Sequence, residues 1–426
     1  MKYLSRLIEH RLLNQLAFCA LLGSSAFVIL LWSPNIFGKH VDHWDKVIIF
    51  IFPWIMVCLA YSWHVLAARE YRFEIILIVS IIILGAVNAA WSDAVSRSTV
   101  HTRIFLSSGI FALWAAMFLL TSRYRRQAFD WFCCGCLAII LPVEIIWWFI
   151  RDINHDEVFN IFTLHPIPLG TLIILLSPGP IFLLVSKNFK MKMCGLLLFF
   201  SSLMLIYITH KRSTWLAVAA MLVVGLMALA RRRKYLIAAG LIVMTLIFSV
   251  QGWRLYTRLD PKVPHYASIL QRLELYNFAL HIWETHPFMG MGLRPLTHAK
   301  YLKDYHQLDK NLTNFPESVA KLQTLDNMVL TGFVELGSLM TLTYLGLVIL
   351  IMARYVRALR LSSESSSSDW YRLLIMLGFA IHSMSYDSLM FPPVNWLFHV
   401  QLGIMAGYYA SNQVSGSISR QARVPA

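Results

Sequence analysis

The residues that most clearly suggest chemistry are two adjacent cations, Lys211 and Arg212, which lie between two apolar runs with almost no loop around them. Two fixed positive charges at a membrane boundary suit a phosphate or pyrophosphate, and the planar guanidinium of an arginine can bind two phosphate oxygens at once. The alternative is that both side chains only end a span and contact lipid headgroups. Because basic pairs on an outer face run against the usual charge bias of membrane proteins, the pair is a candidate anion site.

A further arginine, Arg272, lies in the longest polar stretch of the chain, residues 252–326, and is followed by Glu274. On spacing alone this pair is typical of a surface ion pair of small energetic value. Later in the stretch, Pro287 ends a helix, and Gly290 and Gly292 permit a tight turn. This turn is either ordinary loop punctuation or a functional motif.

Other titratable residues are weaker candidates. The loop histidines are expected to be solvated, and none forms a spacing typical of a metal site, so no metal is predicted. Three ionisable residues lie in or near apolar runs, where such residues are costly and are functional candidates by default. We expect Glu144, beside a helix break at Pro142, to make a buried polar contact, and Asp387, with His382 nearby, to line a cavity or pair with an arginine. The loop histidines are His281, His286, His298 and His306.

The elements that must position these residues are membrane helices. The chain has 426 residues, of which 58% are hydrophobic and 14% charged, whereas soluble domains carry about 25% charged residues. The apolar runs are long enough to be spanning helices, and the alternation expected of a membrane β-barrel is absent. The sequence therefore predicts an all-α polytopic protein with about twelve spans, at residues 13–33, 47–67, 73–91, 104–122, 129–150, 167–186, 193–209, 214–230, 235–251, 328–353, 373–391 and 393–410.

The net charge of +15 is distributed in a way that indicates orientation rather than nucleic-acid binding. With a cytoplasmic N-terminus, the inner segments hold 21 basic residues and the short outer segments seven. This bias predicts that both termini face the cytoplasm and that the long stretch lies on the outer face. Its part from Ser268 to Glu284 has the spacing of an amphipathic surface helix. The serine run 362–368 is expected to be a flexible linker, and the tail after Tyr409 to be disordered.

Several of these residues together resemble the O-antigen ligase and O-antigen polymerase superfamily of envelope glycosyltransferases. The matching elements are Arg212 in the sequence Thr-His-Lys-Arg-Ser, Arg272 at the opening of a helix, and the His-Pro-x-x-Gly-x-Gly turn from His286 to Gly292. They also include the segment 326–330 and the run Glu335–Gly337. These elements cover the C-terminal half of the chain, whereas the first six spans match only in general character.

The resemblance implies transfer of a glycan from undecaprenyl pyrophosphate to an acceptor sugar at the periplasmic face, without metal, other cofactor or nucleotide sugar. It assigns pyrophosphate binding to Arg212 and Arg272, with Lys211 beside them, and it places Asn327 and His286 in the catalytic segment. Members usually carry His where this chain has Asp326. A carboxylate is a weaker base than imidazole, but it is ionised at neutral pH. Asp326 is therefore the candidate general base, and the other loop histidines are substitutes.

The leading interpretation is an O-antigen ligase of the bacterial inner membrane, with a fold of the GT-C-like type and both termini cytoplasmic. Its donor would be an undecaprenyl-pyrophosphate-linked glycan and its acceptor the lipid A–core oligosaccharide, with no nucleic-acid partner. Alternatives are an O-antigen polymerase that uses the same donor, a lipid-linked sugar transporter, and a structural scaffold. The expected organisation is nine spans in residues 1–251, a catalytic periplasmic loop in 252–326, three spans in 327–410 and a cytoplasmic tail in 411–426.

Overall fold

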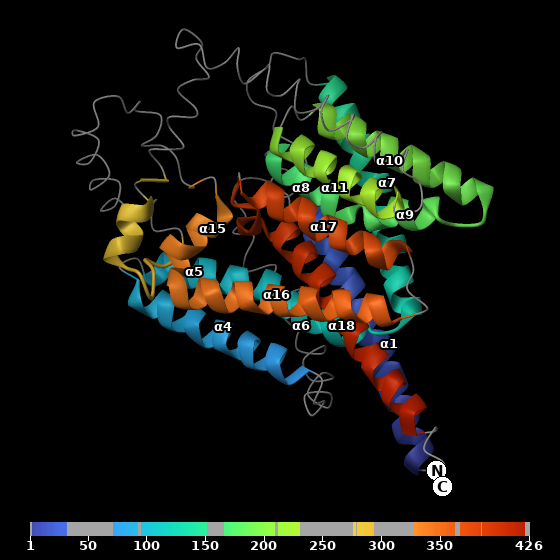
Figure 1. Cartoon of the computed structure of the whole chain (residues 1–426), viewed down its shortest axis with the longest axis horizontal. Coiled ribbons are helices and arrows are strands. Elements are labelled where there is room, and N and C mark those ends of the chain that lie inside the picture. The colour runs from blue at the N-terminus through green and yellow to red at the C-terminus, as the bar shows by residue number, and fades with distance from the viewer. Residues whose placement is uncertain are drawn as a thin grey trace.

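All the regular secondary structure in the described part of the chain is helical (Figure 1). The structure is a computed structural model, and it describes residues 2–31, 71–92, 95–150, 166–208, 212–230, 276–277, 279–293, 325, 327–362, 367–384 and 386–421. Every regular element within these ranges is an α-, 3-10 or π-helix, which agrees with the expected all-α class.

The elements follow the apolar windows along the sequence. The first half contains α1 (Lys2–Ala26), η1 (Phe27–Leu31), α4 (Arg72–Trp91), α5 (Val95–Phe105), η3 (Leu106–Ile110), α6 (Phe111–Leu119) and α7 (Arg123–Ile150). The second half contains α8 (Pro166–Leu176), α9 (Pro178–Leu184), α10 (Phe189–Ile208), α11 (Arg212–Ala230), α15 (Met328–Thr331), η6 (Gly332–Leu336), α16 (Gly337–Leu361), α17 (Ser367–Ser383), η7 (Ser388–Met390) and α18 (Pro392–Gln421).

Six helical segments among the described residues are long and apolar enough to cross a membrane. They are 72–91, 98–119, 123–148, 167–184, 189–208 and 328–361, and each overlaps a window expected from the sequence. Shorter apolar helices at 14–30 and 213–225 overlap two more windows. The windows 47–67 and 235–251 lie outside the described residues, so the count of twelve spans stays a prediction.

Four local expectations are corrected. Helix α7 continues through Pro142, and Glu144 is 2% exposed within it. The window 373–391 is not one helix, because α17 ends at Ser383 and η7 intervenes before Pro392 starts α18. Helix α18 runs on to Gln421 rather than ending in a disordered tail near Tyr409. The serine run is not entirely a linker, because α17 begins at Ser367 within it.

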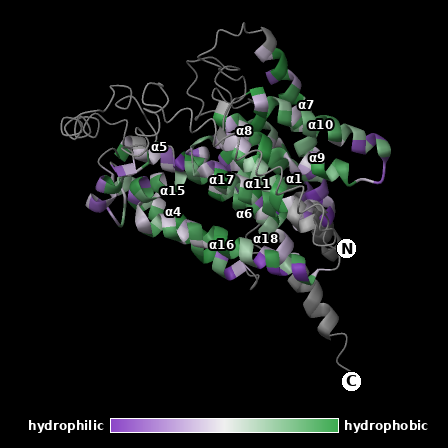
Figure 2. Cartoon of the chain, turned by 45° about the horizontal axis from the view of Figure 1, so that its top comes forward, coloured by the Kyte–Doolittle hydropathy of each residue, from purple (hydrophilic) through white to green (hydrophobic). Residues whose placement is uncertain are grey.

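Helix α18 is the centre of the bundle, and α4 and α10 lie on its outside. From Val394 to Ala410, the side chains of α18 are almost all buried, and it packs against α6, η3, α8 and α16. The most apolar windows of α4 and α10 are only 33% and 28% buried. Their exposed side chains are large and apolar, so these helices are hydrophobic on the outside of the bundle (Figure 2). A hydrophobic exterior of this kind is expected of helices in contact with lipid.

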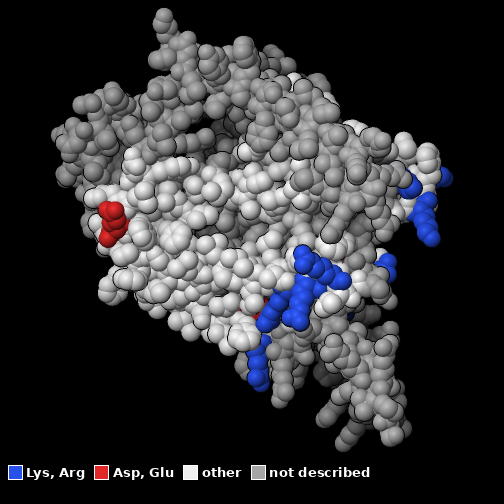
Figure 3. Space-filling model, in the orientation of Figure 1, with Lys and Arg blue, Asp and Glu red and all other residues white. Residues whose placement is uncertain are grey.

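The bundle has two chemically different ends. Helix α4 runs antiparallel to α16, since its first turn pairs with Arg354 and its last turn reaches Glu335. The segment that ends in the glycine turn lies at the left in Figure 1, beside α15 and the start of α5. The described Lys and Arg side chains on the face in view gather toward the other end (Figure 3), and the start of α1 and the end of α18 lie together there.

Candidate functional site

The His-Pro-x-x-Gly-x-Gly turn directly follows a helix at residues 279–285, which overlaps the end of the stretch 268–284 predicted to be amphipathic. The amide of His286 donates to the carbonyl oxygens of Ile282 and Trp283, at 3.2 and 3.1 Å, and the amide of Gly290 donates to the carbonyl of His286 at 3.1 Å. The side chain of Trp283 also donates from Nε1 to Ser338 Oγ at 2.9 Å. The turn is therefore ordered by its own backbone and tied to the start of α16.

The turn and the Glu-Leu-Gly run form one backbone-bonded unit, which we term the motif joint (residues 287–292 and 334–339). The amides of Met291 and Gly292 donate to the carbonyls of Val334 and Glu335, at 3.0 and 2.9 Å. In the other direction, the amides of residues 338 and 339 donate to the carbonyls of residues 287 and 288, at 3.0 and 3.3 Å. Two motifs about 40 residues apart in sequence are thus one structural feature.

Glycine is required at the centre of the motif joint. Gly290 and Gly337 have φ angles of 68° and 77°, which residues with a side chain rarely adopt. A Cβ atom on Gly290 would come within 3 Å of the backbone of residues 335 and 337, and one on Gly337 would meet the backbone of residues 288–290 equally closely. The two glycines therefore let two chain segments approach more closely than any other residue type allows.

A third segment, from the first half of the chain, secures the motif joint through three side chains that we term the clamp: Asn88, Ser92 and Ser98. Asn88 Nδ2 donates to the carbonyl oxygens of both Met289 and Glu335, the latter at 2.9 Å. Ser92 Oγ donates to the carbonyl of residue 291 at 2.7 Å, and Ser98 Oγ accepts from the amide of residue 293 at 3.1 Å. All three side chains are at least 95% buried.

The segment after the candidate base is held by a helix cap. Asn327 Oδ1 accepts from the amides of Val329 and Leu330, both at 3.1 Å, so this side chain starts α15. Capping by asparagine is typical of helix N-termini. The structure thus gives Asn327 a positioning role immediately after Asp326, which itself lies outside the described residues.

A chain of buried polar contacts leads from α15 to α8. Thr331 Oγ1 donates to Asp387 Oδ1 at 2.7 Å. In the next residue, Ser388 Oγ lies 3.0 Å from His382 Nδ1, which also lies 3.0 Å from Thr171 Oγ1. Asp387 and His382 are 1% and 0% exposed, and the expectation that Asp387 lines a cavity or pairs with an arginine stays a prediction.

This chain also approaches the start of α11, where the basic pair lies. The residue before Thr171 is Gly170, and a Cβ atom there would clash with the side chain of Thr214 in the first turn of α11. Helix α11 begins at Arg212 and packs along α17. The backbone of Arg212 is therefore at the same end of the bundle as Asn327 and the motif joint.

Among the remaining predicted site residues, the structure describes the side chain of His286 but not those of the others. His286 is half-buried, and its Nδ1 lies 2.8 Å from Thr285 Oγ1. Lys211, Arg272 and Asp326 lie outside the described residues, as does the side chain of Arg212. Within the described ranges, no cluster of three or more His, Cys, Asp or Glu side chains is arranged to hold a metal ion.

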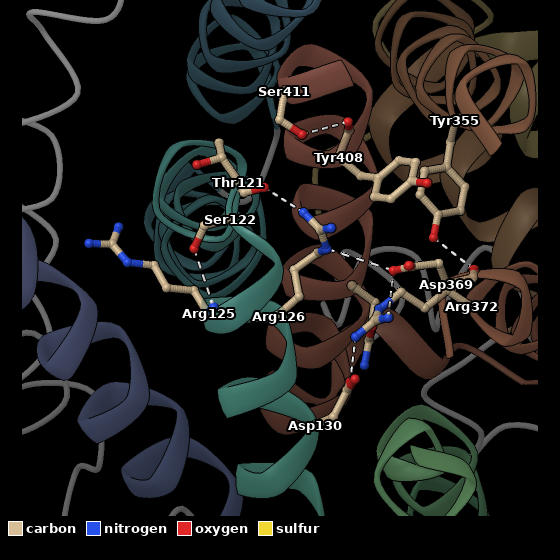
Figure 4. Close-up of polar contacts among 11 residues, drawn as sticks. Thr121, Ser122, Arg125, Arg126, Asp130, Tyr355, Asp369, Arg372, Tyr408 and Ser411 are labelled. Atoms are coloured by element: carbon tan, nitrogen blue, oxygen red, sulfur yellow. Dashed lines mark hydrogen bonds and ion pairs between the residues drawn. The ribbon is translucent and has the colours of Figure 1, made fainter. Parts of the chain in front are cut away.

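The opposite end of the bundle contains a buried ion cluster (Figure 4). Arg372 is 0% exposed and donates to Asp130, to Asp369 at 3.4 Å and to Gln401 at 3.3 Å. Arg126 lies 3.7 Å from Asp369 and donates to the carbonyl of residue 121. The cluster joins α7, α17 and α18. It lies at the start of α17, whereas His382, in the polar chain that leads to α15, lies at the end of that helix.

These observations define the class of the protein: an α-helical, multi-pass membrane protein whose polar motifs converge at one end of the bundle. A family model described as O-antigen ligase matches residues 197–345. This match confirms the resemblance to the O-antigen ligase and polymerase superfamily that the motifs predicted. No protein among those with curated descriptions matches the chain.

The matched segment contains every predicted site residue, together with both halves of the motif joint. The clamp and the residues Asp387 and His382 lie outside it. Sequence analysis missed the clamp completely, because a single Asn and two Ser residues near the ends of apolar helices have no distinctive spacing. Only their contacts with backbone groups of residues 289, 291, 293 and 335 identify them.

Proposed function

We propose that this protein is a membrane glycosyltransferase that moves an O-antigen glycan from undecaprenyl pyrophosphate to the lipid A–core oligosaccharide at the periplasmic face of the inner membrane. The observation that carries the proposal is the convergence of the family's separate motifs. The motif joint, the capped segment at Asn327 and the start of α11 share one end of the bundle.

The charge distribution supports the proposed orientation. On the face in view, the described Lys and Arg side chains lie toward the end away from the motif joint (Figure 3), which suits a cytoplasmic face. The end with the motif joint would then face the periplasm, where both lipid-anchored substrates are available. We include both cytoplasmic termini and the twelve-span organisation in the proposal.

The proposed reaction needs a cation that stabilises the negative charge on the leaving pyrophosphate and a base that accepts the proton of the acceptor hydroxyl. The bond between the anomeric carbon of the donor glycan and the pyrophosphate oxygen breaks, and the acceptor hydroxyl oxygen forms a new bond to that carbon. Undecaprenyl pyrophosphate leaves with the bonding electrons, and the guanidinium groups of Arg212 and Arg272, with Lys211, stabilise its added negative charge. Asp326 takes the hydroxyl proton, with His286 as the alternative base.

The clearest test is a deletion strain examined by a lipopolysaccharide gel and by analysis of glycan attached to undecaprenyl pyrophosphate. A ligase predicts core without any O-antigen and long polymer that accumulates on the carrier lipid. A core that bears a single repeat unit would instead identify a polymerase. An unchanged ladder would exclude both activities and favour the transporter or scaffold.

The deletion strain is then complemented with the wild-type chain, which is the control, and with an Arg272→Ala variant, which tests the assigned pyrophosphate site. The wild-type chain should restore the ladder, and the variant should not, although both should be present in the membrane in equal amounts. Restoration of the ladder by the variant would remove the assigned pyrophosphate site while leaving the class of reaction open to the gel result.

A further inference from the structure

The clamp consists of residues that have no role in the proposed reaction as described above. Asn88 lies in α4, Ser92 is the C-cap of that helix and Ser98 lies in α5, so all three precede the residues that the family model matches. Their side chains nevertheless bond to backbone groups of the matched segment. Side chains that bond to backbone groups hold a segment in place whatever side chains that segment carries. The clamp therefore acts on the position of the segment's backbone.

Asn88 has the central place in the clamp because a single amide nitrogen binds both halves of the motif joint. Its Nδ2 group has two hydrogens, and it donates to the carbonyls of Met289 and Glu335. The first carbonyl belongs to the turn and the second to the run that starts α16. The side chain is 1% exposed, so water does not compete for either carbonyl.

We propose that Asn88 is a positioning residue for glycan transfer: it fixes the glycine turn, which begins at His286, against the start of α16. This inference rests on the proposed function. Arg272 precedes the turn by 14 residues, and Asp326 precedes Glu335 by nine. In sequence, the two halves of the motif joint therefore follow the two residues proposed to bind the pyrophosphate and to accept the proton.

The expected kinetic signature is a loss of turnover rather than of binding. A displacement of about 1 Å between reacting groups can lower a rate roughly 10²-fold. The pyrophosphate arginines are unchanged in an Asn88 variant, so donor binding should persist. We expect Asn88→Ala to lower kcat at least about tenfold and to change the donor KM by less than about threefold.

The first measurement is hydrogen–deuterium exchange on the purified full-length protein in detergent, which needs no substrate. Amides in the peptides 286–293 and 334–339 should exchange at least about tenfold faster in Asn88→Ala, because two hydrogen bonds that hold the motif joint are lost. Asn88→Asp is nearly the same shape but brings acceptor oxygens against two carbonyls, so it should be at least as severe. The control is Ile78→Ala, since Ile78 is fully buried on the same helix and lies about 15 Å from Asn88 along its axis.

The second measurement is transfer kinetics, with undecaprenyl-pyrophosphate-linked glycan and lipid A–core extracted from the producing strain. The proposal is supported if Asn88→Ala loses kcat and loosens both peptides, while Ile78→Ala does neither. Unchanged exchange in Asn88→Ala would overturn it, as would loosened peptides with normal kcat. If the wild-type protein transfers no glycan, the proposed function fails, and the exchange measurement still decides whether Asn88 holds the motif joint.

Discussion

Replacement of Gly337 by alanine is the most direct perturbation of the motif joint. Gly337 has φ 77° and ψ 166°, a region of backbone space that essentially only glycine occupies. A side chain there costs about 1–3 kcal/mol in backbone strain alone. The added Cβ atom would also come within 3 Å of backbone atoms of residues 288, 289 and 290, and these atoms cannot rotate away as a side chain can.

The clash adds to the strain by separating the two halves of the motif joint. Four backbone hydrogen bonds cross between residues 287–292 and 334–339, and each typically contributes about 1 kcal/mol. If two of them are lost, Gly337→Ala should destabilise the protein by about 3–5 kcal/mol in total. The matched control is Gly346→Ala in the same helix, α16, where an added Cβ atom has no neighbour within 4 Å. Because alanine is favoured over glycine in a helix by about 1 kcal/mol, this control should be neutral or stabilising.

The assay is thermal unfolding of both purified variants in one detergent, with hydrogen exchange of the peptide 286–293 as the local measurement. Gly337→Ala should melt well below the wild type and exchange faster in that peptide, and Gly346→Ala should do neither. Equal melting temperatures for the two variants, with unchanged exchange, would refute the conclusion that close backbone contact requires glycine at this position.

Three further predictions concern the charged residues. Arg212→Ala and Arg272→Ala should each abolish glycan transfer in membranes while leaving the protein inserted, because a leaving pyrophosphate loses a fixed cation; transfer at the wild-type rate in either variant would contradict its assignment. Asp326→Ala should be severe and Asp326→His tolerated, since imidazole can also accept a proton, and normal transfer by the alanine variant would require another base. Arg372→Met should lower stability by about 3–5 kcal/mol in thermal unfolding, because it leaves the buried Asp130 carboxylate without its ion-pair partner, and an unchanged melting temperature would show that the cluster is not stabilising.

The helices could largely be predicted from the sequence because membrane spans have a strong one-dimensional signal. Each of the six segments long enough to cross a membrane coincides with an apolar window. The errors fall where local chemistry competes with hydrophobicity. Helix α7 accommodates Pro142 within a continuous helix, whereas Pro392 starts a new helix after a 3-10 turn, and residue type alone does not distinguish these cases.

The candidate site could be predicted only in the parts that resemble a family motif. The glycine turn and the Glu-Leu-Gly run were both identified, but the contact between them depends on the path of two chain segments and has no local signature. The clamp is harder still to predict, since Asn88 acts through backbone carbonyls more than 200 residues away in sequence. Long-range contacts of this kind become visible only when the fold brings the segments together.

The buried ion cluster shows why counting charges predicts orientation without predicting function. Arg126 and Arg372 count toward the basic residues that predict a cytoplasmic side, yet both are at least 93% buried and paired with acidic groups. Such residues hold α7, α17 and α18 together rather than contacting a solvated surface. Of the cations proposed to bind pyrophosphate, Arg212 has its backbone at the opposite end, at the start of α11. An arginine that opposes the topological bias is therefore more informative about chemistry than one that follows it.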